Sequence, residues 1–201
     1  MPITNGYCTL AELKTALAIS DSVDDTPLEA VINATSRMID DYTNRFFYAD
    51  GTTLSPVARI YTPIDTWRLS VDDFVSITEL ATDQNMDYSY DTIWASTDYI
   101  VDPVNNPRRG WPLTRLTAIN RYIFSRLLPQ SVKITGVWGW SAVPPEVNMA
   151  CLIQASRLFV RRQSPFGIAG SPDLGTVRLS ARLDADVEAL LRPFRRRNGA
   201  Q

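Results

Sequence analysis

Between residues 132 and 159 the sequence changes from the period of a strand to the period of a helix. Apolar side chains and glycines first recur at every second position, which is typical of a strand with one buried face. Two prolines follow, and proline cannot donate to a sheet but suits the first turn of a helix. The apolar spacing after them is helical. We therefore predict a rigid strand-to-helix elbow, built from Gly136, Trp138, Trp140, Pro144 and Pro145.

Two capped helices are predicted before this elbow. Thr9 and Glu12 have the spacing of a capping box, and leucines share one face of the residues that follow. Thr26 repeats this device as the N-cap of a second helix, with Pro27 in the first helical position. Apolar residues then keep the spacing of an amphipathic helix as far as Phe46, so we expect a two-sided helix of about five turns.

The middle of the chain has the composition of a β region. β-branched and aromatic clusters are separated by Pro, Asn, Asp and Gly, which predicts about five or six strands joined by polar loops. After the elbow we expect a long helix over residues 145–163, the loop "RQSPFGIAGSPDLG" and the short extended piece "TVRLS". A last helix is predicted near residues 184–192, where acids come first and Pro193 should end it.

These elements predict an α+β fold in two parts. Residues 1–49 and 141–201 form a small helical bundle, which contains the N-terminal helix pair, the long helix after the elbow and the short C-terminal helix. Residues 50–140 form an antiparallel β region inserted into that bundle.

The sequence contains few residues or motifs that could form a catalytic site or bind a cofactor. Histidine is absent, which excludes a Ser-His-Asp triad, a Cys-His pair and every histidine-based metal site. The glycines form no phosphate-binding motif. Adjacent aspartates occur, but neighbouring side chains point apart on a helix or a strand, so adjacency alone does not aim two carboxylates at one atom. We expect no enzyme activity, no cofactor and no bound metal.

The cysteines, the apolar runs and the first residues of the chain bear on its cellular location. Cys8 and Cys151 each lie beside a helical apolar pattern, so we expect buried free thiols in preference to a disulfide. No run approaches the ~18 apolar residues of a membrane span, and the first residues lack the features of a signal peptide. We expect a soluble protein made inside the cell, with no membrane partner.

Charge is distributed unevenly along the chain. Residues 1–102 hold 17 acids and 5 bases, whereas residues 103–201 hold 5 acids and 15 bases. The two halves can neutralise each other within one fold, or they can face neighbours of opposite sign in an assembly. The sequence leaves both interpretations open.

The C-terminal segment "RPFRRRNGAQ" is the one charge run with a plausible partner. Such a basic segment can bind phosphates, bind an acidic protein surface or remain solvated. Leu190, Leu191 and Phe194 give the segment an apolar stripe, which favours docking onto a protein.

The order of these pieces resembles the head-to-tail connector (adaptor) proteins of tailed double-stranded DNA bacteriophages. The resemblance spans almost the whole chain and is carried by "YCTLAELKTALAI", "IDDYTNRFF", "VKITGVWGWSAVPPEVNMACLIQASRLFVRR" and "LDADVEALLRPFRR". In that family a helical bundle carries a β element, and copies assemble as a ring beneath the portal. The β region here, about 90 residues, is longer than the hairpin of compact family members.

The resemblance implies a structural virion protein at the head-tail junction, assembled in the cytoplasm of the bacterial host. Its partners would be its own copies in a ring, twelvefold by family, the portal protein, the next tail or stopper component, and double-stranded DNA that passes through the lumen without sequence-specific binding. In a ring, the elbow would hold the sheet at a fixed angle to the bundle, because small angular errors prevent closure. The residues expected to dock on the portal are Val187, Leu190, Leu191, Phe194, Arg195, Arg196 and Arg197.

Two other functions remain in competition with this interpretation. The first is a DNA-binding module that acts through the C-terminal arginine cluster, whose binding would be sensitive to salt. The second is a metal-dependent nuclease or hydrolase that uses the aspartates, which a cleavage assay with added magnesium or manganese would reveal.

Overall fold

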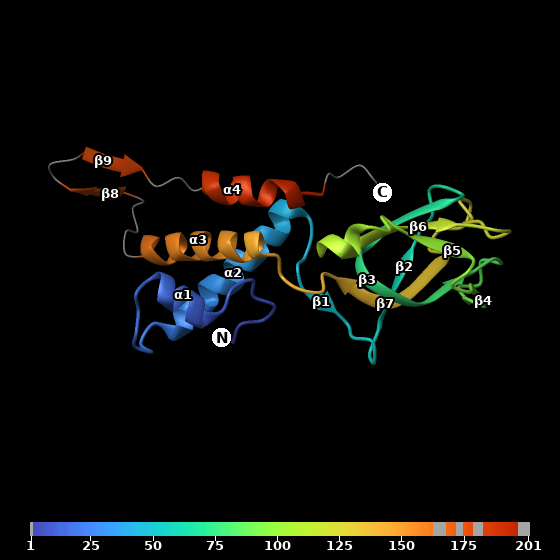
Figure 1. The fold of residues 1–201 in the computed structure, drawn as a ribbon, viewed down its shortest axis with the longest axis horizontal. Coiled ribbons are helices and arrows are strands. Elements are labelled where there is room, and N and C mark those ends of the chain that lie inside the picture. Colours follow the sequence, from blue (N-terminus) through green and yellow to red (C-terminus); the bar gives the residue numbers. More distant parts are fainter. Residues whose placement is uncertain (1, 163–167, 172–174, 179–182, 197–201) are drawn as a thin grey trace. The chain divides into compact units, whose positions relative to one another are not determined.

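The chain folds into two compact units, which we describe separately. A computed structural model describes residues 2–162, 168–171, 175–178 and 183–196. The helical unit comprises residues Met1–Phe46 and Val143–Arg196, and the β unit comprises Phe47–Ala142 (Figure 1). The sequence-based division placed these boundaries at residues 49/50 and 140/141. The predicted α+β fold class is confirmed.

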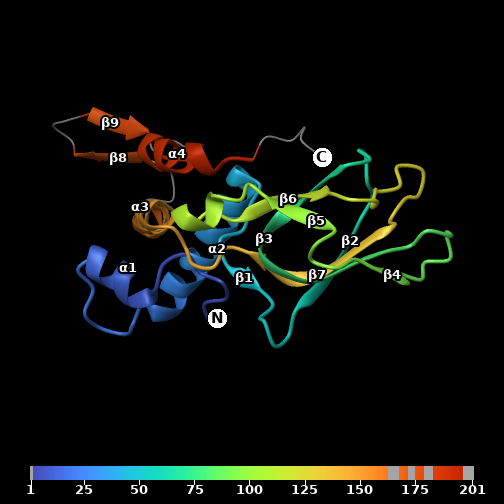
Figure 2. The ribbon, with the colours of Figure 1, turned by 45° about the vertical axis from the view of Figure 1, so that its right-hand side comes forward.

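The described part of the helical unit contains four helices. They are α1 (Leu10–Ala16), α2 (Asp25–Thr43), α3 (Pro145–Arg161) and α4 (Ala185–Leu191), and α4 continues into the 3₁₀ helix η2 (Arg192–Phe194). The second and third helices pack on each other, and α1 and α4 both contact α3 (Figure 2). The side chains buried between the helices are largely aliphatic: Leu13, Leu28, Ile32, Ile39, Val147, Ala150, Ala155, Val187 and Leu191.

The helix ends confirm one predicted cap and correct another. Thr9 and Glu12 form the predicted capping box of α1. The prediction of Thr26 as the N-cap of α2 is wrong, because the helix begins at Asp25. Asp24 is the N-cap residue, and Asp25, the first helical residue, forms an ion pair with Lys14 at 2.6 Å. Pro27 is therefore the third helical residue and not, as predicted, the first. The first four N–H groups of a helix have no partner within it, so proline is tolerated at either position.

The loop predicted after α3 contains a strand. β8 (Ile168–Ser171) and β9 (Gly175–Arg178) form an antiparallel pair, of which only β9 was predicted as an extended piece. The sequence of β8, Ile-Ala-Gly-Ser, lacks the β-branched alternation that predicts a strand.

A seven-stranded antiparallel sheet forms the β unit. Its strands are β1 (Ala49–Asp50), β2 (Val57–Tyr61), β3 (Arg68–Thr82), β4 (Thr92–Ile93), β5 (Tyr99–Asp102), β6 (Leu113–Ala118) and β7 (Val132–Gly139), and η1 (Asn106–Arg109) is a 3₁₀ helix. The order is β1-β7-β3-β6-β5, with β2 also on β7 and β4 also on β3. The sequence predicted one or two strands fewer because β1 and β4, at two residues each, are too short to show a period.

Aromatic side chains fill much of the β unit. Phe47, Phe74, Trp94, Phe124, Trp138 and Trp140 are buried. Trp94 stacks on Phe124 with ring centroids 4.9 Å apart, and Trp140 lies 5.1 Å from Phe47. Such rings bury large areas each, so a few of them can supply a core for a unit of this size.

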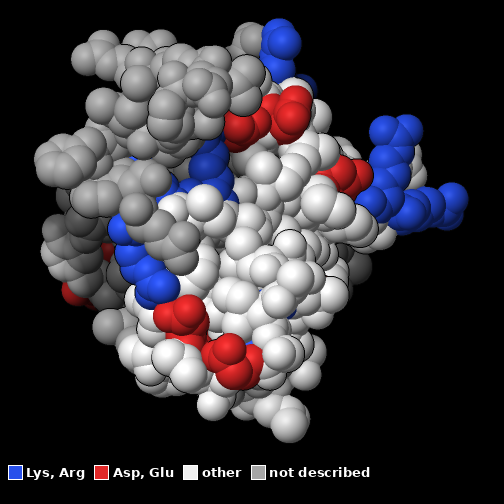
Figure 3. Space-filling view, turned by 90° about the vertical axis from the view of Figure 1, so that its left-hand side faces the viewer, with Lys and Arg blue, Asp and Glu red and all other residues white. Residues whose placement is uncertain are grey.

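The fold removes the charge asymmetry of the sequence. The helical unit has 12 acids and 11 bases, and Phe47–Ala142 has 10 acids and 8 bases, because each unit takes residues from both halves of the chain. Ion pairs join the halves directly, at 2.9 Å between Arg162 and Asp24 and at 3.6 Å between Lys133 and Glu79. On the face drawn in Figure 3, side chains of both signs lie among uncharged ones. Neutralisation within the fold therefore explains the asymmetry.

None of the described helices has the length and hydropathy needed to span a membrane. Nor does the described part of the chain bring three or more His, Cys, Asp or Glu side chains together in a way that could hold a metal ion.

Candidate assembly surfaces

The elbow has the strand and the helix that the sequence predicted on its two sides. β7 ends at Gly139, and α3 begins at Pro145 with Pro144 in the N-cap position. Gly139 has a φ of 86°, a conformation that glycine adopts without strain and that turns the chain out of the sheet. The sequence analysis did not include Gly139 among the elbow residues, although a glycine at the end of a strand could have suggested this role.

The two elbow tryptophans are anchored inside the β unit. The indole N–H of Trp138 donates to the carbonyl of Val57 at 2.8 Å, and that of Trp140 donates to a carboxylate oxygen of Asp73 at 3.0 Å. The guanidinium of Arg59 also lies over the Trp138 ring, 4.8 Å from its centroid. Because both indoles are buried and hydrogen-bonded, the strand that leads to the elbow is held firmly in its own unit.

Gly136 lies where two strands come unusually close. A β-carbon at this position would lie 2.3 Å from the carbonyl oxygen of Ser76, which no real side chain tolerates. The pairing of β3 with β7 shifts register on both sides of this point, between Phe74 and Ser76 and between Ile77 and Glu79. Gly136 therefore permits the close approach of a bulged strand.

The C-terminal stripe is buried in the protein's own helical unit. Val187, Leu191 and Phe194 are buried, and Leu190 is half-buried. The segment is tied back to the end of α2, because Arg45 Nε donates to the carbonyl of Phe194 at 2.8 Å. This placement corrects the expectation that the apolar stripe is open to a partner: most of the side chains meant for a portal groove pack on their own unit.

The arginines of the segment have different positions. Arg195 is exposed and its guanidinium lies over the Tyr42 ring, 5.4 Å from the centroid. Arg196 is half-buried, and its backbone N–H donates to the carbonyl of Thr43 at 2.7 Å. Arg197 lies outside the described residues. Docking of these arginines on a portal stays a prediction.

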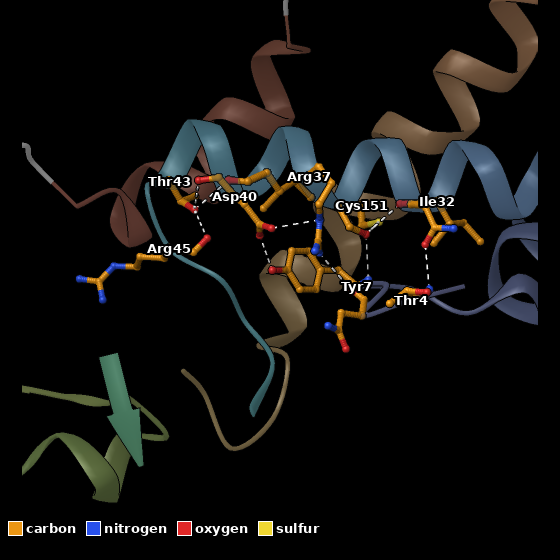
Figure 4. A network of polar contacts seen from close by, with 12 residues as sticks. Thr4, Tyr7, Ile32, Arg37, Asp40, Thr43, Arg45 and Cys151 are labelled. Carbon is orange, nitrogen blue, oxygen red and sulfur yellow. Dashed lines mark hydrogen bonds and ion pairs between the residues drawn. The ribbon is translucent and has the colours of Figure 1, made fainter. Parts of the chain in front are cut away.

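The N-terminal segment, residues 2–9, is tied to α2 by a network of polar contacts (Figure 4). The backbone N–H of Thr4 donates to Asn33 at 2.9 Å, and that of Tyr7 donates to the Ser36 hydroxyl at 3.0 Å. The Tyr7 hydroxyl donates to the carboxylate of Asp40. Burial raises the pKa of Asp40, against the opposing effects of Tyr7 and of Arg37. The network fixes a segment that has no regular secondary structure of its own.

Three loops of the β unit meet and expose large apolar side chains. This loop cluster comprises residues 62–67, 83–91 and 119–131. Backbone hydrogen bonds join the first loop to the third, from Phe124 N–H to Thr66 at 2.8 Å, and the second to the third, from Asp83 N–H to Ser131 at 2.8 Å. The exposed apolar side chains of the cluster are Ile64, Trp67, Met86, Tyr88, Ile123 and Leu127.

A buried carboxylate shapes the middle loop of the cluster. Asp83 is buried and accepts hydrogen bonds from the backbone N–H groups of Asn85, Met86 and Tyr88, at 2.9 to 3.0 Å. Met86 and Tyr88 have positive φ angles of 65° and 60°, yet their side chains are 58% and 66% exposed. The loop therefore holds two apolar side chains in solvent although the backbone conformations of both residues are unfavourable. Exposed apolar side chains held in this way are a feature of contact surfaces.

The first loop of the cluster is organised in a similar way. Asp65 accepts hydrogen bonds from the backbone N–H groups of Trp67 and Arg68 at 2.7 and 2.8 Å, and these bonds lower the pKa of its carboxyl. The sequence predicted polar loops between the strands but did not predict this apolar surface. The available signal was the presence of Trp, Met, Ile and Leu in segments that turn residues otherwise dominate.

The architecture defines a class of protein: an α+β chain whose helical unit is assembled from both chain ends and carries an inserted antiparallel sheet. Solved structures of the same fold come from the necks of phage-like gene transfer agent (GTA) particles. The neck of the empty GTA particle, computed with C6 symmetry, contains a chain that is 15% identical with a TM-score of 0.58. The neck of the native GTA particle, computed with C12 symmetry, contains one that is 18% identical with a TM-score of 0.56. Each match covers 97% of this chain and 92% of the other.

The chain therefore shares its fold with these chains, and the predicted resemblance to head-to-tail connectors is confirmed at the level of the fold. No protein-family model matches the sequence, and no curated protein matches it.

Proposed function

We propose that this protein is a structural subunit of the neck of a phage-like particle, in which copies form a ring between the portal and the next tail or stopper component. The observation that carries the proposal is the fold match, because it extends over nearly the full length of both chains and includes both units. The ring would be twelvefold, in line with the C12 symmetry of one of the matching necks. DNA would pass through its lumen, assembly would take place in the host cytoplasm, and the protein would have no enzymatic role.

Imaging tests the ring. The full chain is examined by negative-stain electron microscopy, alone and mixed with the portal protein of the same particle. We expect rings with rotational symmetry in the mixture, since a template favours closure of a heterologous contact. A chain that neither forms rings nor binds the portal would overturn the proposal.

The loop cluster is the surface that we assign to the contact between copies. It supplies six exposed apolar side chains on hydrogen-bonded loops, whereas the C-terminal stripe is buried. Its charged residues include both signs, Asp87 and Asp91 with Arg121 and Arg126, which suits a neighbouring copy better than a partner of one sign.

Substitutions at the cluster separate this contact from folding. The double variant Tyr88→Ser/Leu127→Ser should keep the melting temperature of the parent but lose ring formation on the portal, because both side chains are exposed. The matched control, Val23→Ser/Leu54→Ser, removes two side chains outside the cluster that are at least as exposed, and it should assemble normally. Single copies bound to the portal would support a contact between copies. Loss of portal binding would instead place the portal contact at the cluster.

The elbow is proposed to fix the angle that ring closure requires. Pro144→Gly/Pro145→Gly removes the restriction on the backbone and leaves both cores intact, so the monomer should fold while ring incorporation is impaired. The control Pro56→Gly/Pro107→Gly removes one proline from the loop before β2 and one from η1, both in the β unit, and should incorporate normally. Normal assembly of the elbow variant would refute the role of the prolines.

Binding of duplex DNA through the arginine cluster is tested by Arg195→Ala/Arg196→Ala/Arg197→Ala. A substitution is needed because deleting residues 192–201 would also remove the buried Phe194. If the protein binds duplex DNA in a salt-sensitive manner and the triple variant does not, the chain is a DNA-binding module. The neck proposal predicts no such binding.

A further inference from the structure

The two cysteines of the chain meet inside the helical unit. Cys8 lies in the N-terminal segment, directly before the N-cap of α1, and Cys151 lies in α3. Their sulfur atoms are 3.3 Å apart, and both residues are buried as free thiols. The sequence predicted the burial, but it gave no reason to expect contact between residues 143 positions apart.

We propose that Cys8 and Cys151 are an oxidisable pair, which closes to an intramolecular disulfide that joins the N-terminal segment to α3. A disulfide has an S–S distance of about 2.05 Å, so the sulfurs must approach by little more than an ångström. Cys151 is held by its helix, whereas Cys8 belongs to a segment without regular secondary structure and can supply the movement. This inference rests on the contact between the sulfurs and is independent of the proposed function.

The surroundings assign different roles to the two thiols. The hydrogen bond with Cys151 and burial raise the pKa of the Cys8 thiol, whereas the same hydrogen bond lowers the pKa of Cys151. The Ser36 hydroxyl also lies 3.8 Å from the Cys151 sulfur. Because the thiolate is the attacking species, Cys151 is the first nucleophile.

The oxidant we consider is a small disulfide, oxidised glutathione. The Cys151 thiolate attacks one sulfur of glutathione disulfide, forms a mixed disulfide and releases one glutathione thiolate, which takes up a proton. Cys8 then loses its proton and attacks the Cys151 sulfur of the mixed disulfide, which releases the second glutathione. The two protein thiols are oxidised to one disulfide, and one glutathione disulfide is reduced to two thiols.

Access to the thiols requires the N-terminal segment to move. Both sulfurs are covered in the closed structure, and the segment is tied down by Asn33, Ser36 and Asp40 of α2. The side-chain amide of Asn148 adds a bond from α3 to the carbonyl of Tyr7, at 2.9 Å. Transient opening of these contacts therefore limits the rate of oxidation.

The disulfide would join the two stretches of chain that make the helical unit. Cys8 belongs to the stretch before the β unit and Cys151 to the stretch after it, so the closed loop contains the whole β unit. A cross-link over so long a loop restricts the unfolded chain strongly. The oxidised protein should therefore melt at a temperature several degrees higher than the reduced protein.

The test uses the full chain in its native state. The protein is incubated with oxidised glutathione, alkylated to block the remaining thiols and digested. Mass spectrometry should find the peptide of Cys8 linked to that of Cys151, and the intact chain should have lost two hydrogens without gaining alkyl groups. Absence of the linked peptide after long incubation, or its appearance only in denaturant, would overturn the proposal.

Variants separate the pair from general effects of oxidation. Cys8→Ser should stop at the mixed disulfide on Cys151 and show no rise in melting temperature on oxidation. Tyr7→Phe removes the bond to Asp40 and should speed the formation of the cross-link several-fold, because the segment opens more often. If Cys8→Ser does not fold, Cys8→Ala serves in its place. Intermolecular dimers in place of the internal link would contradict the assignment.

Discussion

The helical unit and the β unit are built on opposite plans. The helical unit joins two distant stretches of chain, packs a largely aliphatic core and ties its N-terminal and C-terminal segments to α2. The β unit is one continuous stretch, and its core combines large aromatic side chains with aliphatic ones. The first plan makes stability depend on both chain ends. The second makes it depend on pairing within one stretch, much of it between strands far apart in the sequence, such as β2 with β7 and β3 with β6 and β7.

The units also differ in what they expose. Of the 15 exposed large apolar side chains among the described residues, 12 belong to the β unit, and half of those lie in the loop cluster. The buried core of the β unit does not include these side chains, so they contribute little to its stability. The comparison therefore separates a unit whose chain ends serve its own stability from a unit whose exposed loop cluster we propose as the contact between copies.

The largest expected effect is the loss of the helical unit when its C-terminal segment is removed. Deletion of residues 183–201 takes away three buried side chains, each worth about 2 to 5 kcal/mol, which together approach the whole stability of a domain. Hydrogen exchange should lose protection in α2 and α3 while β3 and β7 keep theirs. Deletion of residues 197–201 alone is the control and should leave the melting temperature as in the parent. An unchanged melting temperature would show that the segment is not part of the core.

Two matched substitutions test the independence of the units. Ile32 and Ile134 are both fully buried, one in each unit, so Ile32→Ala and Ile134→Ala should each cost about 2 to 5 kcal/mol of unfolding free energy. Hydrogen exchange should rise mainly in the unit that carries the substitution. Leu158 of α3 is only half-buried, so Leu158→Ala should cost less. Equal loss of protection in both units would mean that they unfold together.

A smaller effect is expected at the bulge of the β unit. Gly136→Ala places a methyl group against the Ser76 carbonyl and should destabilise the protein by about 1 to 3 kcal/mol, measured by denaturant unfolding. Thr135→Ala, at the neighbouring and partly exposed position, is the control and should stay near the parent. Parent-like stability of Gly136→Ala would show that β3 can move away from β7.

The sequence could predict features that depend on neighbours along the chain. The helices, the capping box, and the strand and helix on the two sides of the elbow follow from spacings of a few residues, and these are present. The reason for Gly136 could not be predicted, because it lies in the Ser76 carbonyl of another strand. The loop cluster and the cysteine pair likewise depend on segments that only the fold brings together. The apolar stripe of Val187 and Leu191 was recognised, but periodicity does not tell which surface covers it.

The smallest effect is one of pH, and it has opposite signs in the two units. Burial raises the folded pKa of Asp40 in the helical unit, so the protonated carboxyl favours the folded state below the unfolded pKa, and this contribution is lost as pH rises through the folded pKa. The backbone N–H groups of Trp67 and Arg68 lower the folded pKa of Asp65 in the β unit. Its contribution is present above the unfolded pKa and is lost as pH falls through the folded pKa.

Asp40→Asn and Asp65→Asn keep an acceptor oxygen and remove the titration, so they isolate the two contributions. Melting temperatures of the parent and both variants are measured from about pH 3 to about pH 7. Relative to Asp40→Asn, the parent should lose stability as pH rises, because the unfolded carboxyl ionises more readily than the buried one. Relative to Asp65→Asn, the parent should gain stability over the same range, by a small amount because this carboxylate is exposed to solvent. Difference curves that slope the same way would show that burial does not set the pKa of Asp40.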